Sequence, residues 1–109
     1  MTNTENPFSG AAKNPDVKAR RRVSYRRRDT PAGVLRALAG DRDIDVRINV
    51  ALHPNTPTNV LQQLASDPNG TVREQVARNP GTPPEVLAVL ALDLDSDVQE
   101  AAREALGER

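Results

Sequence analysis

The sequence predicts an all-α protein, a short α-solenoid of three helix-pair repeats preceded by a basic N-terminal arm or helix. Three observations predict this fold. The blocks 30–55, 56–81 and 82–107 align without a gap at a period of 26 residues. Each block carries apolar residues at helical spacing. Aromatic residues make up 2% of the 109 residues, so the core must be built from aliphatic side chains, which suits thin helical layers.

The repeat is defined by eight positions that are identical in all three blocks. They are Thr30/Thr56/Thr82, Pro31/Pro57/Pro83, Val34/Val60/Val86, Leu35/Leu61/Leu87, Leu38/Leu64/Leu90, Ala39/Ala65/Ala91, Asp41/Asp67/Asp93 and Val46/Val72/Val98. Other positions agree in the first two blocks, where the third has Gln99, Ala102, Arg103 and Leu106. This divergence is typical of a terminal repeat that must face water on one side.

The first helix of each block is expected to begin at the Thr-Pro pair, with threonine as the N-cap and proline as the first helical residue. In the third block Glu85 completes a capping box. The turn before the second helix contains an aspartate, which is expected to accept hydrogen bonds from nearby amides. The residues expected to cap helices and turns are Thr30, Pro31, Thr56, Pro57, Thr82, Pro83, Glu85, Asp41, Asp67 and Asp93.

The second helix of the first block carries its apolar stripe at Val46, Val50 and Ala51. It is expected to end before His53-Pro54, because the residue ahead of a proline disfavours helical dihedral angles. Neither helix of a block is long enough to persist alone, so each block must stack on its neighbours. Between blocks, the repeated aspartates and the arginines Arg47 and Arg73 are expected to form a polar ladder.

The chain is expected to divide into a mobile N-terminus (1–13), a basic arm acting as a helical cap (14–29) and the solenoid (30–107). Residues 1–28 contain eight Lys and Arg residues and two acidic residues, a net charge of +6, which leaves −6 for the remainder. A capping helix is expected from Asn14 to about Arg28. Its apolar edge against the first repeat would consist of Val17, Ala19 and Val23.

Two segments carry the fullest form of the repeat: T-P-x-x-V-L-x-x-L-A-x-D at Thr56–Asp67 and V-R-x-x-V-A-x-N-P at Val72–Pro80. This pattern resembles the leucine-rich repeat variant family over residues 30 to about 107. The resemblance implies a right-handed solenoid that alternates an α-helix with a second, shorter helix, either α or 3₁₀. It implies no enzymatic activity. Some members carry a cysteine-ligated iron-sulfur cluster, which this chain cannot hold because it has no cysteine.

No catalytic, cofactor or metal site is expected. His53 is the only histidine, and a loop-capping role is favoured over a catalytic or metal-binding one. Asp93, Asp95, Asp97 and Glu104 match some positions of a calcium loop, but Val98 stands where that loop needs glycine. There is no glycine-rich phosphate loop and no nucleophile motif.

Three functions remain open, of which a protein-interaction scaffold comes first. Its candidate surface residues are Arg47, Asn49, Arg73 and Gln75. The alternative is binding of nucleic acid, or another polyanion, by the arm at 13–28, with Tyr25 as the one stacking residue. The candidates for this role are Lys13, Lys18, Arg20, Arg21, Arg22, Tyr25, Arg26, Arg27 and Arg28. The third is electrostatic self-association of the basic arm with an acidic solenoid.

The partner is therefore expected to be an unidentified protein, a nucleic acid or a second copy, and not a membrane. No stretch approaches the roughly 20 apolar residues of a membrane span, and the first ten residues do not resemble a signal peptide. A cytoplasmic location is expected. Arg21-Arg22-Val23-Ser24 also matches a site for a basophilic kinase.

Overall fold

The computed structural model describes residues 10–25 and 28–107. These residues form a 3₁₀ helix, η1, and seven α-helices, with no strand among them. The elements are η1 (Ala11–Lys13), α1 (Val17–Tyr25), α2 (Ala32–Leu38), α3 (Ile44–Leu52), α4 (Thr58–Leu64), α5 (Gly70–Arg78), α6 (Pro84–Leu90) and α7 (Ser96–Ala105). The predicted all-α repeat fold is confirmed. The expected mobility of residues 1–9 and the roles of Arg26 and Arg27 lie outside the described residues.

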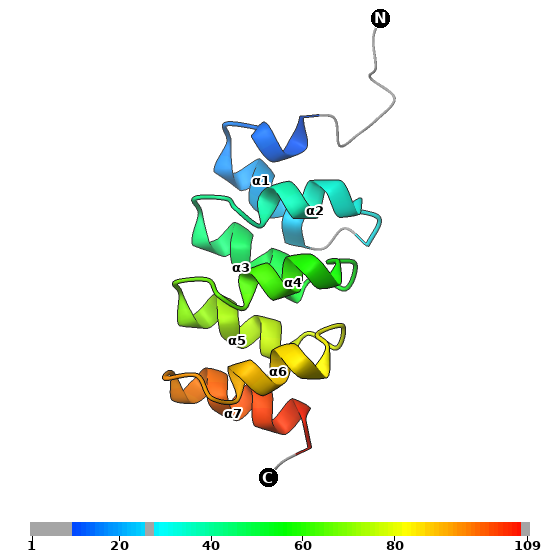
Figure 1. The fold of residues 1–109 in the computed structure, drawn as a ribbon. Helices are drawn as coiled ribbons and strands as arrows, with labels where there is room; N and C mark the ends of the chain where they lie inside the picture. The colour runs from blue at the N-terminus through cyan, green and yellow to red at the C-terminus, as the bar shows by residue number, and fades with distance from the viewer. Residues whose placement is uncertain (1–9, 26–27, 108–109) are drawn as a thin grey trace, which may run out of the picture.

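The helices form two layers along a molecule of 55 × 20 × 18 Å (Figure 1). In one layer α1, α3, α5 and α7 pack on one another in that order, and α2, α4 and α6 form the other. The core between the layers is aliphatic, as the repeat columns predict. Val46, Val50 and Ala51 of α3 are fully buried, and so are Leu35 and Leu38 of α2.

Both helices of each repeat are α-helices, and the second is the longer. The first helices have 7 residues, whereas α3 and α5 have 9 and α7 has 10. Longer and shorter helices therefore alternate, as the resemblance implies, but the second helix of each block is the longer one. The 3₁₀ alternative does not apply to the repeats, since both helices are α-helices. A side-chain cap gives the second helix a defined start. The side chains of Asp43, Asn69 and Asp95 accept hydrogen bonds from backbone amides in the first turns of α3, α5 and α7.

The expected Thr-Pro caps of the first helices are wrong by one residue. The N-caps are Pro31, Pro57 and Pro83, and none of these helices has a side-chain cap. The threonine hydroxyls instead point back to the preceding helix. Thr56 donates to the main-chain oxygen of Val50 at 2.6 Å, Thr82 does the same to Val76, and Thr30 reaches Val23 at 3.1 Å. They thus satisfy a helix C-terminus rather than an N-terminus.

The expected capping box at Glu85 is also absent. Because Pro83 is the N-cap of α6, Glu85 stands one position too early for a capping box, in the first turn. The hydroxyl of Thr82 is already engaged with Val76. A carboxylate in the first turn still lies favourably in the helix dipole.

The N-terminal segment is an additional half-repeat. α1 packs on α3 as α3 packs on α5. Asn14 Oδ1 accepts the amide of Asp16 at 2.9 Å, as Asp67 Oδ1 accepts the amide of Asn69 at 2.9 Å. The described capping helix, α1, begins at Val17 rather than at Asn14, and η1 lies within the segment expected to be mobile. The solenoid therefore consists of three repeats and a preceding second helix.

Candidate interaction surface

A ladder of arginine and aspartate side chains runs along the solenoid edge where the second helices begin. Arg47 Nε donates to Asp67 Oδ2 at 2.8 Å, and Arg47 Nη1 donates to the main-chain oxygen of Asp41 at 2.9 Å. Arg73 repeats both contacts one block later, with Asp93 and with the main chain of Asp67. Each arginine therefore joins the turns of two consecutive blocks.

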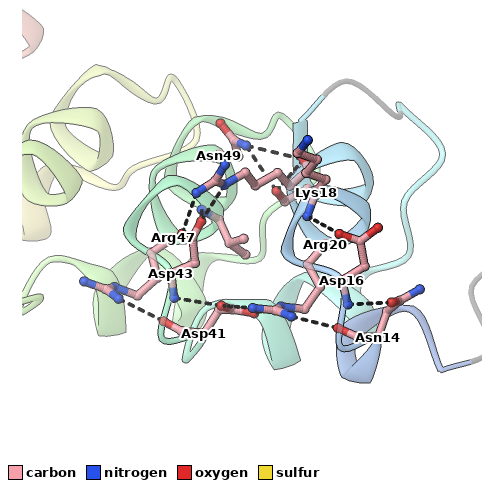
Figure 2. A network of polar contacts seen from close by, with 11 residues as sticks. Asn14, Asp16, Lys18, Arg20, Asp41, Asp43, Arg47 and Asn49 are labelled. Atoms are coloured by element: carbon pink, nitrogen blue, oxygen red, sulfur yellow. Dashed lines mark hydrogen bonds and ion pairs between the residues drawn. The ribbon is translucent and has the colours of Figure 1, made fainter.

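The ladder begins in the basic arm. Arg20 Nε donates to Asp41 Oδ2 at 2.7 Å, and its Nη1 donates to the main-chain oxygen of Asn14 at 2.7 Å. Figure 2 shows Asn14, Arg20 and Asp41 in one row. Arg20 is only 5% exposed. This arginine is thus part of the fold and is unavailable to a polyanion.

Arg21 is also engaged within the protein. Its Nε and Nη2 donate to the two carboxylate oxygens of Asp43 at 3.0 and 2.8 Å, a bidentate contact. Its Nη2 also lies 3.5 Å from Asp45 Oδ2. The hydrogen bond from Arg21 lowers the pKa of Asp43 to about 2, against the opposing effect of burial. In the ladder, the hydrogen bond from Arg73 likewise lowers the pKa of Asp93 and raises that of Arg73. These aspartates are therefore held in the charged form.

The other described cations of the arm lie at the surface. Lys13, Lys18, Arg22 and Arg28 are exposed, and Tyr25 is 52% exposed. The sequence places all of the arm's cations in one group, but the structure separates the described ones into the ladder, an ion-paired arginine and this exposed set.

The candidates for repeat-surface contacts also fall into two groups. Arg47 and Arg73 have their guanidinium groups in the ladder, with side chains 16% and 19% exposed. Asn49 and Gln75 lie at equivalent positions on α3 and α5, partly exposed. Asn49 Nδ2 donates to the hydroxyl of Ser24 at 3.2 Å, which ties α3 to α1.

The outer side of the layer of second helices forms one continuous surface, which we call the graded face. Each helix contributes positions spaced i, i+3 or i+4, and i+7. Its members are Lys18, Arg21, Arg22 and Tyr25 of α1; Asp45, Ile48, Asn49 and Leu52 of α3; Thr71, Glu74, Gln75 and Arg78 of α5; and Asp97, Glu100 and Glu104 of α7. The face is basic at α1 and acidic at α7.

One hollow on the graded face is shared by two neighbouring helices. It has a volume of about 430 Å³ and is lined by Lys18, Arg21, Arg22, Tyr25, Asp45 and Asn49 from α1 and α3. The basic end is thus an open depression with an aromatic side chain.

The remaining chemical candidates have structural roles. His53 is buried, and its Nδ1 accepts the backbone amide of Asn55 at 3.0 Å. Ser24, the centre of the kinase motif, is fully buried, and its hydroxyl donates to the main-chain oxygen of Arg21. Within the described residues no group of His, Cys, Asp or Glu side chains could hold a metal ion, including the segment around Asp95. No described helix is long and apolar enough to cross a bilayer.

The third repeat exposes three aliphatic side chains that sequence reasoning missed. Val89, Leu92 and Leu94 are 67%, 77% and 103% exposed. The second repeat has Gln63 and Ser66 at the positions of Val89 and Leu92. The replacement of these polar residues by aliphatic ones in the third block is the sequence signal that could have revealed the exposed side chains.

These observations define a helical-repeat protein with an N-terminal half-repeat. Two adjacent stretches, residues 44–69 and 70–95, match the model of the leucine rich repeat variant family. Each match spans one second helix and the following first helix, so the chain carries repeats of this family, and the resemblance is confirmed. The family is a non-catalytic repeat type. No curated protein and no solved structure matches the chain.

Proposed function

We propose that this chain is a non-catalytic interaction module that binds a protein through the graded face. Repeats of this family commonly serve protein interaction, which supports the general role. The choice of face rests on one observation, the change from Lys18 and Arg22 at one end to Glu100 and Glu104 at the other. The buried positions of α3 and α5, by contrast, carry the same valine and alanine residues, as packing requires. The exposed positions carry charge that packing does not require, and separated charges of this kind orient and select a partner.

Site-directed photocrosslinking in cells tests this proposal. A photoreactive amino acid replaces Thr71, which is exposed on α5 in the middle of the graded face. The matched control carries it in place of Gln62, exposed on α4 in the other layer. We expect a protein adduct from position 71 and not from position 62. Equal labelling from both positions, or no adduct from either, would contradict the proposal.

Polyanion binding at the basic end is a second candidate function. It is supported by the depression that Lys18, Arg22 and Tyr25 line, where a base could stack on the phenol ring. Arg20 and Arg21 are already paired, so few phosphate contacts are available at α1. The acidic α7 would repel a strand that followed the whole face. Any such binding would be short and weakly selective for sequence.

Gel retardation of random single-stranded and duplex fragments tests this second candidate. Deletion of residues 1–28 is unsuitable, because it removes Arg20 from the ladder and uncovers α3. The double substitution Lys18→Glu/Arg22→Glu leaves the buried side of α1 intact. If α1 contacts phosphates, retardation at low salt is lost in this variant. Each contact contributes about 0.9 to the logarithmic salt slope with duplex DNA and about 0.7 with single strands. Absence of retardation by the parent chain rules this function out.

A further inference from the structure

We infer that the partner of the graded face is a second copy of this chain, with the two long axes antiparallel. This inference rests on the proposed function, since it names the occupant of the same face. In the described part of the chain, none of the ion pairs involves Lys18 or Arg22 at one end, or Asp97, Glu100 or Glu104 at the other. Both ends therefore carry charge that the monomer leaves in water.

The order of charges makes the face complementary to itself in one arrangement only. When two copies lie face to face and antiparallel, α1 of each copy meets α7 of the other, and Lys18 and Arg22 meet Asp97, Glu100 and Glu104. A parallel arrangement would place α1 against α1, and like charges would oppose one another. The antiparallel arrangement has two-fold symmetry, so the same contact forms twice and the assembly closes at two copies.

The middle of the face suits the same arrangement. There α3 of each copy meets α5 of the other, and the half-exposed Leu52 faces the aliphatic stem of Arg78 of the second copy. Tyr25 adds an aromatic side chain at the α1 end of the face, opposite α7 of the second copy. The molecule is 55 Å long and about 20 Å wide, so the face is large enough for the roughly 800 Å² per partner that a stable interface buries.

End-to-end stacking is the competing geometry, and the sequence of the last repeat opposes it. Gln99 occupies the position that Arg47 and Arg73 hold in the earlier blocks. The arginine ladder therefore cannot continue from α7 into another copy. Arg103, also exposed on α7, stands where the earlier blocks have the alanines Ala51 and Ala77.

Sedimentation of the full chain tests the inference. At low ionic strength we expect a mass of two chains, and added salt should return it to one, because exposed charges are screened within about 10 Å at 0.1 M salt. Lys18→Glu/Arg22→Glu should weaken the dimer at least about tenfold. The matched control, Arg36→Glu/Arg42→Glu, makes the same change in charge at exposed residues outside the face and should dimerise as the parent does.

Restoring the complementarity gives the decisive result. Glu100→Lys/Glu104→Lys alone should weaken the dimer to a similar extent, whereas the chain with all four substitutions should dimerise as the parent does, because the charges at its two ends are exchanged in sign. A mixture of the two double variants should form a heterodimer. A monomer at low salt, an open series of larger masses, or failure of the four-fold variant to recover would overturn the inference. If the parent chain is monomeric but position 71 crosslinks to a different protein in cells, the proposed function stands and this inference fails.

Discussion

The guanidinium of Arg47 joins two consecutive repeats, because it donates at once to the carboxylate of Asp67 and to the main-chain oxygen of Asp41. Its partner Asp67 has a side chain only 5% exposed. The same carboxylate accepts the backbone amide of Asn69, the N-cap of α5. One buried ion pair thus fixes the distance between blocks and the start of the next helix.

Arg47→Met should lower the free energy of unfolding by about 2 to 3 kcal/mol, because it leaves the carboxylate of Asp67 buried without its cation. Urea denaturation monitored by circular dichroism measures this change in the free energy of unfolding. Arg36→Met provides the control, since Arg36 is exposed on α2 and should change stability by less than about 0.5 kcal/mol. Equal effects of the two substitutions would show that the ladder contributes nothing beyond surface charge.

The repeat number, the two layers and the core could be predicted from the sequence, because these features depend on positions that recur. Val46 and Val72 occupy one column, and a position that is apolar in every block must face the core in every block. The sequence could not show in the same way which aspartate side chain each arginine of the ladder pairs with. Arg47 stands six residues after Asp41 and twenty before Asp67, and only the stacking of the blocks shows that its Nε pairs with Asp67.

The half-repeat at the N-terminus was missed for a different reason. Asn14 precedes Asp41 by 27 residues, whereas Asp41 precedes Asp67 by 26. A gapless alignment at one fixed period therefore stops at Thr30. The signal was present in Asn14-Pro15-Asp16, which parallels Asp67-Pro68-Asn69 once a single inserted residue is allowed. Because the half-repeat is not recognised in a gapless alignment, the sequence alone groups Arg20 with the polyanion candidates, although it belongs to the ladder.

Thr56→Asp should destabilise the protein, and Thr56→Ser should not. An N-cap accepts hydrogen bonds, so aspartate would serve there as well as threonine. In the structure the hydroxyl of Thr56 donates to the main-chain oxygen of Val50, and a carboxylate has no proton to donate at neutral pH. We expect a loss of about 2 kcal/mol for Asp and about 1 kcal/mol for Thr56→Val, measured by thermal unfolding. A stable Asp variant would restore the N-cap assignment.

His53→Asn should leave stability within about 1 kcal/mol of the parent, because asparagine performs the equivalent task one repeat later. Asn79 Oδ1 accepts the amide of Gly81 as His53 Nδ1 accepts that of Asn55. Asn79 Nδ2 also donates to the main-chain oxygens of Ala51 and His53 at 2.7 and 3.0 Å.

Asn79→Asp, by contrast, replaces that donor with an acceptor in a buried position, and it should cost about 2 to 3 kcal/mol. Urea denaturation of both variants gives the comparison. A large loss of stability for His53→Asn would mean that the imidazole has a role that the repeat does not explain.

Acid should remove the stabilisation that the Arg21–Asp43 pair provides. The pKa of Asp43 is about 2 in the folded protein, below the ordinary value of 3.8, so the folded state binds this proton less readily than the unfolded chain. The contribution to stability is therefore fully present above about pH 4 and is lost as the pH falls towards 2. Asp43→Asn should be less stable than the parent at neutral pH, and the difference should shrink on acidification. Unfolding by urea at about pH 6 and about pH 2.5 measures this difference in stability.

The control is the same substitution in the Arg21→Met background. There the effect of Asp43→Asn on stability should depend less on pH, because Arg21 is the main cause of the low pKa of Asp43. A difference between parent and Asp43→Asn that stays constant across this range would show that the carboxylate is not held by Arg21 in solution.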